Sequence, residues 1–135
     1  MLTTKCINPE IMRVLSLCGH GDKILIADGN YPLYAKTGEA AKVYLGVIPG
    51  LPTVTDVLSA VLSVVNVEKA EVMVPDDGSE PEIFGEFREL LNGMELSPLG
   101  RWEFYDACGE KMLLLAISTG EQRVYANILL TVGVA

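Results

Sequence analysis

Residues 19–32 read GHGDKILIADGNYP, and this stretch predicts both the centre of the fold and the place of a site. Its middle part, Lys23 to Ala27, is a short apolar run typical of a buried strand. Turn-forming residues flank the run, with His20, the only histidine of the chain, before it and Asp28 directly after it. A buried strand is a rigid support, so it can hold the flanking groups at the fixed spacing that a site requires.

Length, charge and composition narrow the class of protein. The 135 residues are enough for a real core, and half of them are hydrophobic, so we expect one ordered domain over 1–135. The net charge of −8 argues against nucleic acid and against an anionic membrane surface, because both attract basic patches. No apolar run reaches the length of a membrane helix, and the polar N-terminus shows no signal core. We therefore expect a cytoplasmic protein.

Hydrophobic periodicity predicts helices that alternate with strands. Helices are expected over about 9–18, 53–65, 79–91 and 101–107, and strands over 23–27, 42–47, 71–74, 112–117 and 125–132. This alternation is typical of the α/β class, a single-domain layered fold with helices packed on a central sheet. The nearly all-apolar run 112–117 is expected to be a central strand buried on both faces, and residues 94–100 are expected to be a loop.

Two of the expected helix starts carry a capping pattern. Thr53 and Asp56 have the spacing of a capping box, in which the first side chain and the third helical residue bond to each other's backbone. Ser79 with Glu82 gives a stronger version of the same pattern.

The three cysteines, Cys6, Cys18 and Cys108, show no spacing typical of a metal or redox motif. Free cysteine is often buried, so we expect three reduced structural thiols. One histidine and no paired cysteines leave few soft ligands, which argues against a structural zinc site.

His20 lies in a glycine-flanked turn between an expected helix end and the buried strand. Two interpretations stay open: a turn histidine that hydrogen-bonds backbone, or an acid–base group, since imidazole has an unperturbed pKa of ~6.5. Asp22 and Asp28 are equally open. Aspartates often form turns and caps, whereas a carboxylate can also orient an imidazole or bind sugar hydroxyls. The residues alone indicate an α/β domain with a candidate acid–base site.

Three blocks of sequence resemble one known family. Residues 19–32 resemble the opening signature of the fucose mutarotase and ribose pyranase family, and residues 119–130, TGEQRVYANILL, resemble its closing signature. Between them, RWEFY at residues 101–105 is similar to an Arg-x-x-Phe-Tyr block typical of the fucose branch. The blocks occur in the family's order, and the whole length fits one family domain.

The resemblance implies an enzyme that interconverts ring forms of a sugar. One branch of the family exchanges the anomers of fucose, and the other exchanges the pyranose and furanose forms of ribose. The resemblance further implies a Rossmann-like α/β fold, no cofactor and no metal. It also implies a homo-oligomer, commonly a decamer of two stacked pentameric rings, with sites near the subunit contacts.

The resemblance also assigns sugar-binding roles. The family's first sugar-binding aspartate falls on Asp28. The fucose-branch arginine falls on Arg101, where the ribose branch has histidine. The closing segment that contacts the sugar falls on Tyr125, Ala126 and Asn127.

The resemblance places the family's acid–base histidine on His20, with Asp22 as its candidate orienter and Tyr125 as a second proton-transfer or hydrogen-bonding partner. A hemiacetal opens when the anomeric hydroxyl loses a proton and the ring oxygen gains one, so one group accepts while another donates. Three aromatic residues either present an apolar face to the sugar ring or pack in the core: Tyr31, Trp102 and Tyr105.

The resulting prediction is a sugar mutarotase of the fucose branch that acts on L-fucose. Ribose pyranase is the alternative within the same enzyme class, and a non-catalytic, ring-forming sugar-binding protein is the alternative of a different class. Asn30 stands where the fucose branch often has histidine, and the segment after Tyr105 is slightly longer than in relatives. Both features bear on the substrate more than on the reaction.

Overall fold

The computed structural model describes residues 1–135 as a six-stranded sheet with helices on both faces. The elements in chain order are α1 (Pro9–Leu15), β1 (Lys23–Ala27), β2 (Ala41–Tyr44), α2 (Val54–Leu62), β3 (Val67–Met73), α3 (Ile83–Leu90), β4 (Leu96–Leu99), α4 (Arg101–Cys108), β5 (Leu113–Ser118) and β6 (Ile128–Val132). The strands lie in the order β2-β5-β1-β6-β3-β4. Strand β6 runs antiparallel to its neighbours β1 and β3, and the other pairs are parallel. The α/β fold class is confirmed.

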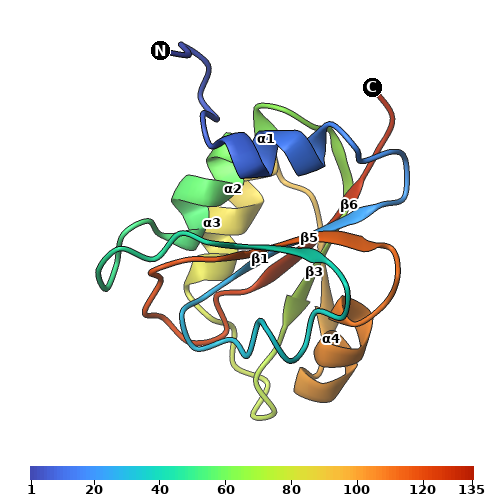
Figure 1. Cartoon of the computed structure of the whole chain (residues 1–135). Helices are drawn as coiled ribbons and strands as arrows, with labels where there is room; N and C mark the ends of the chain where they lie inside the picture. Colours follow the sequence, from blue (N-terminus) through green and yellow to red (C-terminus); the bar gives the residue numbers. More distant parts are fainter.

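The sheet separates two cores of unequal size. Helices α1, α2 and α3 cover one face and α4 covers part of the other, as Figure 1 shows. The larger core holds Ile24 and Ile26 of β1, whereas the smaller core under α4 holds Leu25 and Ala27. Side chains alternate along a strand, so β1 is buried on both faces and forms a rigid support between its two end loops.

The two capping patterns have different outcomes. Thr53 Oγ1 accepts the N–H of Asp56 at 3.2 Å, and the Asp56 carboxylate accepts the N–H of Thr53 at 3.0 Å, so α2 begins as predicted. The start predicted at Ser79 is wrong. Ser79 donates its N–H and its hydroxyl to Asp77 instead, and α3 begins only at Ile83 without a side-chain cap. A local aspartate turn has competed successfully with the helix start.

Strand β4 replaces the loop expected over 94–100. It contains Pro98, which cannot donate a ladder hydrogen bond and therefore argues against a central strand. The topology explains the exception, because β4 is an edge strand paired only with β3.

Strand β6 begins at Ile128, later than the apolar run 125–132 indicated. Tyr125 lies in the preceding loop with a φ of 58°, the left-handed region that few residues other than glycine adopt. Hence the backbone turns sharply just before the strand, and a pattern of hydrophobicity does not report such a turn.

The three cysteines are free thiols, as expected, and Cys6 and Cys108 are buried. Burial raises the pKa of Cys108 to about 12 and that of Cys18 to about 11. Both thiols are therefore protonated near neutral pH, which makes them poor nucleophiles. None of the helices combines the length and the apolar character that crossing a bilayer requires.

Candidate active site

Asp28 and Asn127 form a reciprocal pair where β1 ends and β6 begins. The Asp28 N–H donates to Asn127 Oδ1 at 2.9 Å, and Asn127 Nδ2 donates to Asp28 Oδ2 at 3.1 Å. The same carboxylate also accepts the N–H groups of Asn30 and Ala126. These two strand ends are neighbours because β1 and β6 pair antiparallel, so residues far apart in sequence meet here.

The Asp28 carboxyl is nearly enclosed, with 2% of its residue surface exposed. Burial raises the pKa of Asp28 above its ordinary value, even though the N–H donors of Asn30 and Ala126 favour the charged form. A carboxyl held this way is an orienting acceptor whose position is fixed before any ligand arrives.

A cavity of about 220 Å³ opens beside this pair. It is lined by Asp28, Asn30, Tyr31, Met73, Arg101, Tyr105, Val124, Tyr125 and Asn127. The structure therefore brings together four of the five predicted sugar-binding residues, which come from the end of β1, the start of α4 and the loop before β6. The fifth, Ala126, does not line the cavity: its side chain is fully buried in the larger core, and it contributes its backbone N–H to Asp28.

Arg101 opens α4 at the mouth of the cavity. Its Nε donates to the Tyr105 hydroxyl at 3.2 Å, and its guanidinium carbon lies 5.1 Å from the centre of the Trp102 ring and 5.6 Å from that of Tyr105. Aromatic faces attract cations, so the two rings hold the guanidinium at the rim with N–H donors to spare.

The three aromatic residues have separate roles. Tyr31 and Tyr105 line the cavity and touch each other edge to face, with their ring centres 5.4 Å apart. Trp102 does not line it, and 66% of its surface is exposed. Tyr31 also packs against Phe104 in the smaller core. The cavity wall thus has apolar ring surface next to a polar floor.

His20 lies at the other end of β1. The neighbouring Gly21 N–H donates to the carbonyl of Val132, the last residue of β6, whereas Asp28 lies beside the residue that precedes β6. A five-residue strand is about 16 Å long, so His20 and Asp28 of one chain cannot contact the same small molecule. The sequence motif places the two residues close in number, but the extended strand keeps them apart.

The carboxylate beside His20 is not the expected one. Nε2 of His20 lies 2.9 Å from Glu68 Oε2, and 58% of the histidine side chain is exposed. Asp22 instead accepts the Gly19 N–H at 2.8 Å and so serves the turn. In this structure the carboxylate next to His20 is thus Glu68 and not Asp22, and the orienting role of Asp22 stays a prediction. Glu68 comes from β3, and no local sequence pattern links it to His20.

The fold and the site define a small α/β protein with a narrow cavity, lined by aromatic and polar side chains, at the ends of two antiparallel strands. Residues 1–135 match the model of the RbsD / FucU transport protein family. The chain belongs to that family.

Relatives of both branches are similar to the chain over its whole length. The chain is 30% identical to a D-ribose pyranase of Clostridium perfringens, and the alignment covers 99% of this chain and 98% of that protein. It is 32% identical to a D-ribose pyranase of Paracidovorax citrulli, with the same coverage of both proteins. Bacillus subtilis RbsD complexed with D-ribose aligns with a TM-score of 0.86 at 30% identity, over 100% of this chain and 99% of that one. The fucose mutarotase of Streptococcus pneumoniae in complex with L-fucose aligns with a TM-score of 0.84 at 26% identity, with the same coverage.

Proposed function

We propose that this protein is a sugar mutarotase that opens and recloses the ring of a free monosaccharide, with L-fucose as its substrate. The observation that carries the proposal is the cavity itself: a buried carboxylate, an amide, a phenol and a guanidinium converge on one small space, from Asp28, Asn127, Tyr125 and Arg101. Neutral, hydroxyl-rich ligands need this mixture of acceptors and donors. The family relatives named for D-ribose and L-fucose support a monosaccharide as the ligand.

The reaction needs two coupled proton transfers. One group takes the proton of the anomeric hydroxyl, another protonates the ring oxygen, and the aldehyde then closes on either face. Each transfer by a positioned side chain contributes about 10²–10⁴-fold. Tyr125 is one of three phenols that line the cavity, and Asp28 holds a sugar hydroxyl as an acceptor. His20 supplies an imidazole, a side chain that can both accept and donate a proton.

His20 would reach the sugar from a neighbouring copy. Three features support this arrangement. His20 and Asp28 lie at opposite ends of β1, and the imidazole of His20 is exposed. The third feature is the resemblance of the chain to a family that forms rings. We propose a homo-oligomer, a decamer of two pentameric rings, in which the His20 end of one subunit meets the Asp28 end of the next.

An exposed apolar arm fits the same assembly. The end of β2 and the segment that projects after it carry large apolar side chains that are at least half exposed: Tyr44, Val47, Ile48 and Leu51. Contiguous exposed apolar surface commonly marks a contact between proteins.

Arg101 supports fucose as the substrate, since it matches the fucose branch and offers a planar fork of donors at the cavity mouth. The second candidate is D-ribose. It is favoured by the relatives of 30% and 32% identity, which are named D-ribose pyranase.

Saturation-transfer NMR on L-fucose, D-ribose and D-galactose decides between these possibilities. We expect the protein to accelerate anomer exchange of L-fucose above the spontaneous rate. Acceleration of ribose ring conversion alone would make the protein a ribose pyranase. Binding of a sugar without any accelerated exchange would instead make it a non-catalytic sugar-binding protein.

A further inference from the structure

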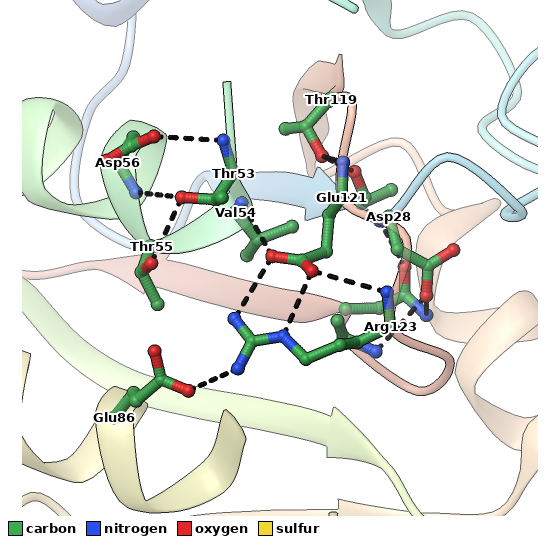
Figure 2. Close-up of polar contacts among 12 residues, drawn as sticks. Asp28, Thr53, Val54, Thr55, Asp56, Glu86, Thr119, Glu121 and Arg123 are labelled. Atoms are coloured by element: carbon green, nitrogen blue, oxygen red, sulfur yellow. Dashed lines mark hydrogen bonds and ion pairs between the residues drawn. The ribbon is translucent and has the colours of Figure 1, made fainter. Parts of the chain in front are cut away.

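An ion pair between a buried carboxylate, Glu121, and a half-buried arginine, Arg123, lies in the loop that joins β5 to β6. The Glu121 carboxylate is 4% exposed, and it accepts N–H groups from Arg123 through the backbone at 3.2 Å and through Nε at 3.0 Å. Its second oxygen accepts from Arg123 Nη2 at 3.2 Å and from the N–H of Val54, the first residue of α2, at 3.4 Å. Arg123 also pairs with Glu86 of α3. Figure 2 shows the carboxylate held between Val54 and Arg123.

The pair stays ionic at neutral pH. Burial alone would raise the pKa of Glu121, but the hydrogen bonds donated by Arg123 and Val54 more than offset it and hold that pKa below its ordinary value. The loop is therefore tied to two helices of the α2–α3 layer by charge-assisted hydrogen bonds, which are stronger than neutral ones.

The other end of the same loop is tied to β1. Ala126 donates its N–H to Asp28, and Asn127 forms the reciprocal pair with that residue. Only Val124 and Tyr125 lie between the two anchors. Tyr125 adopts its left-handed φ of 58° there, a conformation that a non-glycine residue keeps only when its surroundings enforce it.

The phenol of Tyr125 has no hydrogen bond of its own within the chain, although it lines the cavity. Its ring packs against the smaller core, and the backbone of the loop sets the direction from which the phenol enters the cavity. An anchor that fixes the backbone on one side of Tyr125 consequently fixes where the phenol stands.

We propose that Glu121 and Arg123 are positioning residues, which hold Tyr125 in its left-handed conformation so that its hydroxyl meets the reacting oxygen of the sugar. The inference rests on the proposed mutarotase function. The pair touches no ligand itself and acts through Tyr125. If the pair only ties the loop to the helices, removing it should lower stability, and its effect on kcat should not depend on whether residue 125 is Tyr or Phe.

A double-mutant cycle separates the two roles. We expect Arg123→Met to lower kcat by roughly 10–10²-fold, because misplacement of a reacting group by about 1 Å has effects of this size, with KM changed by less than about threefold. Tyr125→Phe should lower kcat at least as much. In the Tyr125→Phe background, adding Arg123→Met should have little further effect, since residues that act as one unit are not additive. Multiplied effects in the double variant would overturn the proposal.

The matched control is Arg88→Met. Arg88 lies on α3 and forms an ion pair of the same type with Glu80, which precedes that helix, but this pair lies on the surface. We expect the kcat of this variant to equal that of the wild type.

A second variant distinguishes a local effect from misfolding, because Arg123→Met alone leaves the Glu121 charge buried and unpaired. Arg123→Met combined with Glu121→Gln removes both charges and should show the same loss of kcat.

Amide hydrogen exchange tests the inference independently of activity. We expect the Ala126 N–H to exchange at least about tenfold faster in the Arg123→Met, Glu121→Gln protein than in the wild type or Arg88→Met, as local opening becomes easier. An unchanged rate would overturn the positioning role. Conversely, a wild type without anomer exchange but with this difference would disprove the proposed function and leave the positioning of Tyr125 intact.

Discussion

Asp28 combines near-complete burial with a pKa that this burial raises. The folded chain therefore holds the proton more tightly than the unfolded chain, whose aspartates titrate near pH ~3.9. The stability contributed by this linkage is fully present below about pH 4 and is lost as the pH rises through the folded-state pKa. We expect the free energy of unfolding of the wild type, relative to Asp28→Asn, to decrease as the pH rises above about 4 in denaturant titrations. A constant difference would contradict this account.

Arg101 should decide which sugar is exchanged. Because its guanidinium is held by Trp102 and Tyr105 at the mouth of the cavity, Arg101→Ala should slow fucose exchange by about tenfold or more, the size of one lost charge-assisted hydrogen bond. Arg101→His should weaken fucose exchange and raise ribose ring conversion, as measured by saturation-transfer NMR. Arg13→Ala, which changes an exposed arginine on α1, is the control. If Arg101→Ala exchanges every sugar at the wild-type rate, Arg101 is an ordinary surface residue.

Sequence reasoning found the side chains that carry a motif but not the partners that fix them. Asp28, Arg101 and Asn127 could be predicted because the family signatures mark them, and the structure brings all three to one cavity. Glu68 could not, since it contacts His20 from another strand, 48 residues along the chain. Asp22 is nearer to His20 in sequence, but its carboxylate accepts the backbone N–H of Gly19 and so closes the turn.

The loop before β6 depends on a glycine that admits no side chain. A Cβ on Gly120 would lie 2.7 Å from the carbonyl oxygens of Ile48 and Leu51, closer than atoms can pack. Gly120→Ala must therefore push the loop away from the turn at 48–52, and we expect a loss of about 1–3 kcal/mol in the free energy of unfolding. Gly85→Ala is the control, because a Cβ there meets nothing within 4 Å. Equal thermal stability of the two variants would show that the turn at 48–52 can move aside without a measurable loss of stability.

The strands and helices were predictable where hydrophobic periodicity dominates and not where local polar contacts decide. Strand β1 has the bounds expected from its apolar run. The capping patterns at Thr53 and Ser79 look alike in sequence, but Asp77 intercepts the second one. The left-handed turn at Tyr125 has no signature in composition, so the apolar run predicts a start of β6 at residue 125, whereas the strand begins at Ile128.

The whole molecule exposes His20 at one end of its central strand and the cavity at the other. If the His20 end of each subunit meets the cavity end of the next, the subunits form a head-to-tail ring, in which two different surfaces meet at every contact. We expect light scattering at micromolar concentration to give the mass of a multimer. His20→Asn should assemble normally and slow anomer exchange by at least about 10²-fold, the low end for lost acid–base catalysis. A normally assembled variant with the wild-type rate would remove His20 from the mechanism.

If the proposed ring forms with His20 and Asp28 in their proposed roles, every subunit gives its His20 to one neighbour and receives that of another. A His20→Asn chain is defective as a donor only, and an Asp28→Asn chain as an acceptor only. When the two variants are co-expressed, anomer exchange should be higher than with either variant alone. Random mixing places an intact His20 next to an intact Asp28 at about a quarter of the head-to-tail contacts. Mixed assemblies as inactive as their parents would show that each chain works alone.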